Sequence, residues 1–297
     1  MNQSILDTMR SKLLERTSLG AIPDTVLKTT ASLNTWGTNA IEGSTITRKD
    51  AEKILVDEIT PGNRPVRDVI ETILHERTFR DIVREGRRDI ELKTVLEYHE
   101  SVFGSVLPDA GMWRRVNVRI RGVRHSPPRM EKIVPEMENW IDEYRQRDIE
   151  GEDVFTLAAW MHYGFERIHP FSDGNGRVGR LLLNKHFLNR NWPPVHILPE
   201  HRDEYPDCLA DASGGDLSGL EAFLMKLSAS SLLDLLDRLG TKKDKLISLK
   251  KASALTGYSE KYLALRCQQG ELPALREGRE WRTSQFALEL YSKHKGR

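Results

Sequence analysis

The stretch His169-Pro170-Phe171-Ser172-Asp173-Gly174-Asn175-Gly176-Arg177-Val178-Gly179-Arg180 decides how the rest of this chain is organised. Apolar residues recur at helical spacing on both sides of it, over residues 154–168 and 178–188. This periodicity predicts one helix that ends at the stretch and a second helix that starts inside it. The stretch is therefore expected to be a loop that joins two buried helices.

The start of the second helix has the composition of an anion site. The free N–H groups and the dipole at a helix N-terminus attract negative charge, and glycines at 174 and 176 let the backbone approach a ligand closely. Arg177 and Arg180 are three residues apart and share a helical face, at a helix end that normally favours acids. A di- or triphosphate is the ligand that would compensate both guanidinium groups.

Two further side chains in the stretch supply groups for chemistry. Asp173 is suited to hold a magnesium ion that is shared with phosphate oxygens. A neutral imidazole at His169 is suited to take a proton from an incoming hydroxyl. The alternative is a glycine-rich connector with a buried structural histidine, but that would not explain why an Asp, an Asn and two Arg occur together.

The stretch resembles the motif of the Fic family, HxFx(D/E)GNGRxxR, and fills each of its fixed positions. The resemblance implies transfer of AMP from ATP, with Mg²⁺, to a Tyr, Ser or Thr hydroxyl of a target protein. His169 would be the catalytic base, Asp173 would bind the metal and Phe171 would anchor the loop. The nucleotide-binding residues would be Asp173, Gly174, Asn175, Gly176, Arg177 and Arg180.

Other activities stay open within this resemblance. Family members that phosphorylate their target carry Lys where Gly176 stands, so Gly176 favours nucleotidyl transfer. Hydrolytic removal of AMP from a modified protein uses the same His, Asp and Mg²⁺, with Glu42 positioning water. A regulator that binds DNA and only senses nucleotide through its Fic core is the alternative from another functional class.

An earlier segment is expected to control the nucleotide site. Residues 35–42 are predicted to be helical and to stop at Gly43, and Thr47 with Asp50 predicts the cap of a following helix. Thr38 to Gly43 resembles the family's inhibitory motif, (S/T)xxxE(G/N). The resemblance implies that Glu42 pairs with Arg180 and so takes its guanidinium from the γ-phosphate.

The core between residues 65 and 235 is predicted to be mainly helical. Amphipathic periodicity marks helices near 66–74, 92–103 and 133–144, and His75, His99 and His162 fall within helices without metal-ligand spacing. Residues 115–122 alternate like a half-exposed strand, with a partner near 124–126. The alternatives are a structural hairpin and, from the resemblance, a flap that adds the target backbone as a strand.

The resemblance also gives residues around the nucleotide. Ile120 and Gly122 would border it, and Tyr205 matches a position that lies beside adenine in related proteins. Pro206 and Ser213 stand where some relatives have a second aromatic residue and an Asn. These departures put the adenine pocket and the preference among nucleotides in doubt.

The C-terminal region, residues 241–297, is distinct in charge, with 13 Lys and Arg against 6 Asp and Glu. Helices are expected over 249–256 and 260–269, a hairpin with Trp281 over 274–282, and a last helix over 284–291. This order resembles an excisionase-type winged helix-turn-helix. DNA binding through the second helix and through Arg276, Arg279 and Arg282 is one reading, and a protein-docking module that makes no DNA contact is the other.

Composition and length agree with this division. The chain has 297 residues, a net charge of +1 and 30% charged residues, as is ordinary for a globular protein. Cys208 and Cys267 fit no metal or redox spacing, and no run approaches the length of a membrane span. We therefore expect a cytoplasmic, mainly α protein with a Fic helical core, a small β-hairpin flap and a C-terminal winged helix-turn-helix. The expected regions are 1–64, 65–235 and 241–297, and the resemblance implies a homodimer.

Overall fold

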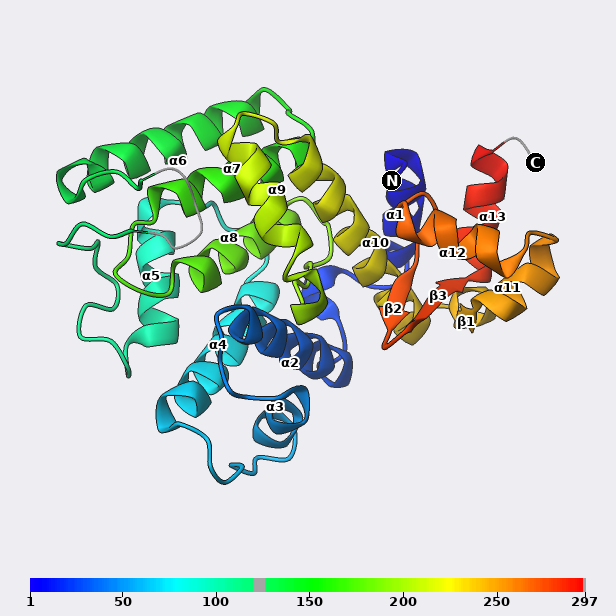
Figure 1. The fold of residues 1–297 in the computed structure, drawn as a ribbon, viewed down its shortest axis with the longest axis horizontal. Coiled ribbons are helices and arrows are strands. Elements are labelled where there is room, and N and C mark those ends of the chain that lie inside the picture. The colour runs from blue at the N-terminus through cyan, green and yellow to red at the C-terminus, as the bar shows by residue number, and fades with distance from the viewer. Residues whose placement is uncertain (120–125, 296–297) are drawn as a thin grey trace. The chain divides into compact units, whose positions relative to one another are not determined.

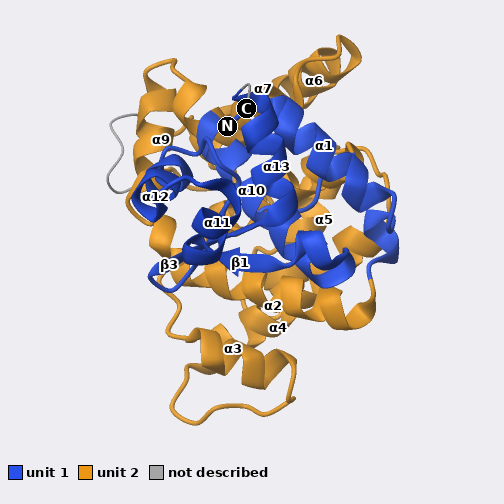
Figure 2. Ribbon diagram, turned by 90° about the vertical axis from the view of Figure 1, so that its right-hand side faces the viewer, with its two compact units in different colours: residues 1–22, 191–195, 222–297 blue, residues 23–190, 196–221 orange. Residues whose placement is uncertain are grey.

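The computed structural model describes residues 1–119 and 126–295. They form a mainly helical protein (Figure 1), so the predicted fold class is confirmed. The chain divides into two compact units (Figure 2). The larger unit comprises residues 23–190 and 196–221, and the smaller unit comprises 1–22, 191–195 and 222–297. Contacts thus group the first residues with the C-terminal region, which the three expected regions did not anticipate.

The larger unit carries the stretch 169–180 between two of its helices. Its α-helices are α2 (Asp24–Ile41), α3 (Arg48–Leu55), α4 (Val66–Arg84), α5 (Leu92–Phe103), α6 (Ile133–Ile149), α7 (Val154–Ile168), α8 (Asn175–Asn189) and α9 (Glu204–Ser213). Short 3₁₀ turns are η2 (Met130–Lys132) and η3 (Pro199–His201).

Helices α7 and α8 form the centre of this unit. The apolar positions that predicted them are buried, with Leu157, Phe165, Val178 and Leu182 at most 1% exposed. Helix α7 packs against α6 and α8, while α4 packs against α2 and α5. The loop between α7 and α8 is therefore mounted on two buried helices.

The predicted N-terminal helix ends are found. Helix α2 ends at Ile41 and is followed by Gly43 with φ +85°, the left-handed conformation that glycine adopts without a steric penalty. Thr47 and Asp50 form the reciprocal capping box of α3. Helix α2 begins at Asp24, earlier than the motif alone indicated.

The predicted strand from Arg115 does not form over the described residues 115–119. Val116, one of its alternating apolar positions, is 56% exposed, so burial of this side chain does not stabilise a strand there. Side chains form hydrogen bonds with backbone groups of this region instead. Arg114 donates to the Val116 carbonyl, and Asn117 accepts from the Met130 N–H. The rest of the expected hairpin, including Ile120 and Gly122, lies outside the described residues.

The smaller unit contains the predicted helix-turn-helix and hairpin. Ser248 and Ser259 cap its two helices, and Gly257, with φ +73°, separates them. The strand nearest residue 246 was too short to predict; it pairs antiparallel with the hairpin in the order β1-β3-β2. The elements are α1 (Gln3–Leu14), η1 (Leu19–Ala21), α10 (Ser218–Leu239, which begins in the larger unit), η4 (Lys242–Asp244), β1 (Leu246–Ser248), α11 (Leu249–Thr256), α12 (Glu260–Gln268), β2 (Leu275–Glu277), β3 (Glu280–Ser284) and α13 (Gln285–His294).

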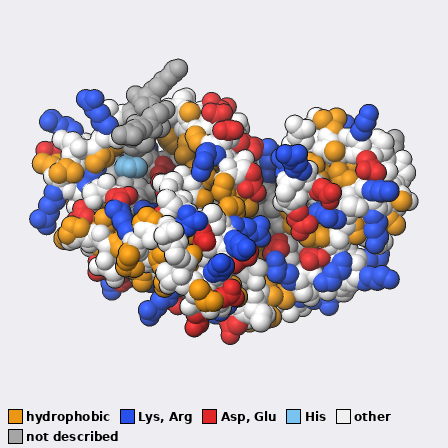
Figure 3. Space-filling model, turned by 60° about the horizontal axis from the view of Figure 1, so that its bottom comes forward, with side chains coloured by type: hydrophobic (Ala, Val, Ile, Leu, Met, Phe, Trp, Pro, Cys, Tyr) orange, Lys and Arg blue, Asp and Glu red, His pale blue; other side chains and the backbone are white. Residues whose placement is uncertain are grey.

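Charged side chains of both signs are interspersed over the face drawn in Figure 3. Within the described ranges, no helix combines the length and the apolar character that crossing a bilayer requires. Cys208 and Cys267 are free and buried.

Candidate active site

The loop from His169 to Gly174 has a residue in the left-handed backbone conformation at each end. His169 ends α7 with φ 51° and ψ 61°, and its N–H still donates to the Phe165 carbonyl at 3.0 Å. Gly174 begins α8 with φ +81°. A Cβ at Gly174 would lie 2.4 Å from the Phe103 ring, so both conformation and space require glycine there.

Asn175 closes this loop with its side chain. Its Oδ1 accepts from the Phe171 N–H at 2.8 Å, and its Nδ2 donates to the Phe171 carbonyl at 2.9 Å. The Phe171 ring is fully buried and stacks on His99 at 3.8 Å. Phe171 thus anchors the loop as expected, while the side chain of Asn175 holds the loop shape and leaves its backbone N–H in the first turn of α8.

Residues 99–114 support the loop from the opposite side, which the sequence analysis did not anticipate. Gly111 N–H donates to His99 Nδ1, so His99 Nε2 carries the proton and donates to the Asp173 carbonyl at 3.1 Å. Burial lowers the pKa of His99, which favours the neutral imidazole over the protonated ring. Ser172 donates to Asp109 at 2.6 Å. The sequence carried no periodicity that could have indicated these contacts.

Arg180 projects from the first turns of α8 into a set of acceptors on α2. Its Nε donates to Thr38 Oγ1 at 2.5 Å, and its Nη2 donates to Glu42 Oε1 at 2.6 Å and to the Thr38 carbonyl at 3.3 Å. Arg180 is only 5% exposed. The expected contact between Glu42 and Arg180 is therefore present, and Thr38 braces the same guanidinium.

The Glu42 carboxylate lies over the first turn of α8. A Cβ at Gly176 would be 2.2 Å from Glu42 Oε1, so only glycine leaves room for the carboxylate. Burial raises the pKa of Glu42, but the charge and hydrogen bond of Arg180 outweigh burial and hold the pKa below its ordinary value. Glu42 is thus an anion at a helix N-terminus, the position where a phosphate would be stabilised.

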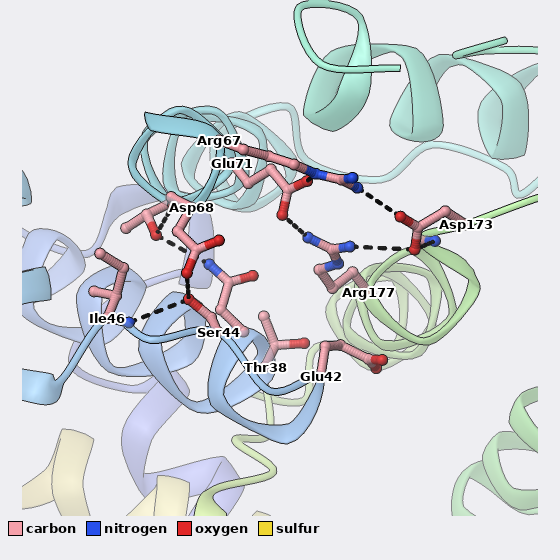
Figure 4. A network of polar contacts seen from close by, with 12 residues as sticks. Thr38, Glu42, Ser44, Ile46, Arg67, Asp68, Glu71, Asp173 and Arg177 are labelled. Carbon is pink, nitrogen blue, oxygen red and sulfur yellow. Dashed lines mark hydrogen bonds and ion pairs between the residues drawn. The ribbon is translucent and has the colours of Figure 1, made fainter. Parts of the chain in front are cut away.

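Helix α2 is attached to the core through buried polar contacts. Thr35 bonds to His75 Nδ1 at 2.9 Å, and Asn39 donates to Thr72 at 3.2 Å. Burial lowers the pKa of His75 to about 3, so its imidazole is neutral. After α2, Ser44 donates to Asp68 on α4 (Figure 4). These contacts fix the rotation of α2 that presents Glu42 to α8.

Asp173 and Arg177 engage a different neighbour, helix α4 (Figure 4). Arg67 donates to Asp173 Oδ2 at 2.5 Å and to Glu71 Oε1 at 2.6 Å. Arg177 pairs with the other Glu71 oxygen and lies over the Phe103 ring at 4.4 Å. The two arginines of the motif both lie on α8 but contact different helices. Arg177 contacts α4, and Arg180 contacts α2.

The donor set at Asp173 fits a magnesium ion held largely by phosphate. No group of three or more His, Cys, Asp or Glu gathers anywhere in the described ranges. A single carboxylate is compatible with Mg²⁺, which in nucleotide sites keeps waters and takes oxygens from the substrate phosphates. Arg67 and the Gly174 N–H now occupy the two oxygens of Asp173. Burial raises the pKa of Asp173, but hydrogen bonding to Arg67 and the charge of Arg177 lower it further, so the carboxylate is ionised.

Glu166, on α7, is a half-buried acid that the motif did not reveal. Its Oε1 would lie 2.4 Å from a Cβ at Gly179. Burial raises the pKa of Glu166 to about 7 despite the charge of Arg180. Tyr205, predicted beside adenine, is 4% exposed, and its hydroxyl bonds to His162 Nε2 at 2.8 Å. The adenine role of Tyr205 stays a prediction, as do those of Ile120 and Gly122.

Fold and site together define a helical protein with an anion-binding helix start beside a histidine. Residues 89–187 match the model of the Fic/DOC family. Protein adenylyltransferase fic-1 of Caenorhabditis elegans is 28% identical over 228 residues, which are 75% of this chain and 44% of the relative. Protein adenylyltransferase Fic of Culex quinquefasciatus is 31% identical over 65% of this chain and 39% of the relative. The chain thus spans only about two-fifths of these curated relatives.

Solved structures share the fold. A Fic domain-containing signaling protein from Bacteroides thetaiotaomicron superposes with a TM-score of 0.69 at 22% identity, covering 78% of this chain and 97% of that one. A fragment of Fic-1 from Caenorhabditis elegans gives a TM-score of 0.65 at 27% identity, covering 80% of this chain and 72% of that one. The protein therefore has the Fic fold.

Proposed function

We propose that this protein is a protein adenylyltransferase, which moves AMP from ATP to a hydroxyl of a target protein. The observation that carries the proposal is the Glu42 carboxylate over the first turn of α8, bonded to Arg180 and beside the loop that begins at His169. The helix N-terminus that accommodates the Glu42 carboxylate would also stabilise a phosphate in the same place. The names of the curated relatives support AMP as the transferred group.

In this reaction His169 takes the proton of the acceptor hydroxyl. The freed oxygen bonds to the α-phosphorus, the bond from that phosphorus to the bridging oxygen breaks, and pyrophosphate leaves. N–H groups at the start of α8 stabilise the charge that develops on the α-phosphate. Arg180, when Glu42 releases it, receives the outer phosphates. Asp173 would hold Mg²⁺, which when bound neutralises phosphate charge.

Glu42 is the proposed inhibitory residue. While its carboxylate holds Arg180, the guanidinium is unavailable and a negative charge stands where another must bind. Glu42→Gly removes that charge and, because Glu42 is the residue that caps α2 next to Gly43, leaves the helix itself intact. His169→Ala removes the base and none of the anion contacts.

The test compares ATP labelled on the α-phosphate with ATP labelled on the γ-phosphate, incubated with cell lysate and Mg²⁺. Glu42→Gly should raise protein labelling from α-labelled ATP at least tenfold over the parent, with none from γ-labelled ATP. Glu42→Gly with His169→Ala should return labelling to background. Equal labelling by the parent and Glu42→Gly would contradict the inhibitory role of Glu42. Transfer of the γ-label would show that the protein phosphorylates its target and does not transfer AMP.

For the smaller unit we propose DNA binding as a second function. The supporting observation is the helix-turn-helix of α11 and α12 next to the hairpin of β2 and β3, whose Arg276 and Arg279 are exposed. The positive charge of Arg282 is offset by two carboxylates that the sequence analysis did not place beside it. Glu277 and Glu280 lie 3.3 and 3.2 Å from its guanidinium. The remaining cations suit phosphate contacts, which position a protein on DNA without reading sequence.

The salt dependence of binding to a duplex of mixed sequence tests this second function. Changing both Arg276 and Arg279 to Ala should reduce the slope of log Kd against log salt by about 2, because each phosphate contact contributes nearly one unit. Arg238→Ala is the control, since Arg238 is paired with Asp234 on α10. No binding by the parent, or an unchanged slope in the double variant, would contradict DNA contact through this hairpin.

A further inference from the structure

Arg114 is a buried arginine whose partners are all backbone carbonyls. It is 2% exposed. Its Nε donates to the His169 carbonyl at 2.8 Å, its Nη1 to the Val116 carbonyl at 2.8 Å and its Nη2 to the Pro128 carbonyl at 2.5 Å. No Asp or Glu within the described ranges forms an ion pair with it. One guanidinium therefore joins the neighbouring Val116 to Pro128 and to His169, which lies 55 positions further along the chain than Arg114.

Burying the positive charge of a guanidinium costs solvation free energy, and without a carboxylate partner other groups must offset that cost. The end of α7 provides it, because the carbonyls of the last helical turn carry the negative end of the helix dipole. An apolar side chain could fill the same space without this demand. The arrangement is therefore explained by what the three hydrogen bonds hold in place and not by packing alone.

The hydrogen bonds hold the backbone on both sides of Pro170. While the Arg114 guanidinium binds the His169 carbonyl, the Arg114 N–H donates to the Pro170 carbonyl at 2.9 Å. The neighbouring Trp113 ring stacks on Phe171 at 5.3 Å. His169 has φ 51°, a conformation that residues with a Cβ rarely adopt and that persists only when its surroundings enforce it.

We propose that Arg114 is a positioning residue for His169. By holding the His169 carbonyl, and the chain at Val116 and Pro128 with the same guanidinium, it sets the direction in which the imidazole leaves the end of α7. The inference rests on the proposed function, in which this imidazole takes the proton of the acceptor hydroxyl. The hydrogen bonds of the Arg114 guanidinium go to backbone carbonyls, of which His169 contributes one.

A positioning role differs measurably from a merely structural one. The proposed phosphate contacts come from residues 173–180, whereas the hydrogen bonds of the Arg114 side chain within the described ranges go to the carbonyls of His169, Val116 and Pro128. Loss of Arg114 should therefore lower kcat and leave the nucleotide Kd unchanged. A displacement of about 1 Å can lower a rate by as much as a hundredfold, so a large kcat effect is expected from a small backbone change.

The experiment uses the full chain with Glu42→Gly as background, and Arg114→Lys and Arg114→Gln as variants. The Lys ammonium keeps the charge but cannot bridge three carbonyls, and Gln keeps only a short amide donor. Isothermal titration with a non-hydrolysable ATP analogue gives both Kd and the number of binding sites. We expect kcat per binding site to fall about tenfold or more, while Kd stays within twofold. Arg129→Lys, an exposed arginine nearby, should change neither quantity.

A second readout does not require transfer. Long-range ¹H–¹⁵N spectra report the imidazole nitrogens, and the His169 signals are those that vanish in His169→Ala. They should shift or broaden in Arg114→Lys and stay in place in Arg129→Lys. Unchanged His169 signals with unchanged kcat would overturn the inference, as would loss of nucleotide binding in both Arg114 variants, which would make Arg114 a folding residue. If Glu42→Gly transfers no AMP, the proposed function fails while the spectra still decide the role of Arg114.

Discussion

At the scale of single residues, the absence of a side chain at Gly176 makes the arrangement of the site possible. Any Cβ there would collide with the Glu42 carboxylate at 2.2 Å. In the proposed function, the same small residue would let a phosphate approach the start of α8 once the carboxylate has left. Gly176 thus serves both proposed states, the inhibited one and the nucleotide-bound one.

Glu166 lies beside the site, and burial raises its pKa toward neutral pH. Its pKa, raised by burial from 4.5 to about 7, means that the folded protein binds a proton there that the unfolded chain releases above about pH 4.5. Unfolding then releases a proton between these two values. The contribution of this group to stability is therefore complete below pH 4.5 and is lost as the pH rises to 7.

Glu166→Gln removes this pH dependence. Relative to the parent, the variant should gain stability as the pH rises from 5 to 8, by at most roughly 3 kcal/mol, because one pKa unit corresponds to about 1.4 kcal/mol. Urea unfolding at both pH values measures the difference. A stability difference between parent and variant that is the same at pH 5 and pH 8 would show that Glu166 ionises in the folded state as it does in solution.

At the scale of elements, two helices divide the motif between them. Helix α2 holds Arg180 through Thr38 and Glu42, while α4 holds Asp173 through Arg67 and Arg177 through Glu71. The contacts of α2 with α4 include polar ones, made by the buried Thr35 and Asn39. Leu27 and Ala31 of α2 are buried as well, at 2% and 0% exposure, so α2 is held by apolar burial and polar contacts together.

In the proposed function, Arg67 on α4 competes with Mg²⁺ for the Asp173 carboxylate, to which it donates a hydrogen bond. In Arg67→Ala, with Glu42→Gly as background, the Mg²⁺ concentration at half-maximal nucleotide binding should fall about two- to fivefold. The effect is modest because both side chains are nearly half exposed, at 48% and 45%, and exposed ion pairs contribute about 0.2–1 kcal/mol. Titration calorimetry with an ATP analogue at a series of Mg²⁺ concentrations measures the shift.

Arg80→Ala is the matched control for this experiment. Arg80 lies on the same helix, is nearly as exposed as Arg67, at 43%, and pairs with the more buried Glu76, so its removal deletes an ion pair of α4 away from Asp173. The control should leave the Mg²⁺ dependence unchanged. Weaker nucleotide binding in Arg67→Ala, with or without Mg²⁺, would instead make Arg67 a phosphate ligand.

At the scale of the whole molecule, the first helix belongs to the smaller unit. Lys12 on α1 bonds to Asp244 at 2.5 Å, and the Asp244 side chain is fully buried. Asn2 bonds to His294 on α13 at 3.1 Å. The sequence indicated an N-terminal helix but not its partner, because an amphipathic pattern shows that a helix has a buried face without showing what covers it.

The predicted helices were largely correct because their causes are local. Helix α5 spans the expected residues 92–103, and the Thr47 cap and the Gly43 stop each depend on neighbours within a few positions. The strand predicted from Arg115 was wrong over residues 115–119, because alternation of residue types does not show that a face is buried. The contact of Glu42 with Arg180 came from the resemblance, since no local rule joins residues 138 positions apart.

What the sequence by itself determined is the loop between α7 and α8, with its glycines, its histidine and the helix start that attracts anions. Only the tertiary structure decided which charges meet there: Arg67 with Asp173, Glu71 with Arg177, and Arg114 with the carbonyl of His169. The physical reason is that helix formation depends on residues three or four apart, whereas a buried ion pair or a braced carbonyl depends on the packing of helices distant in sequence.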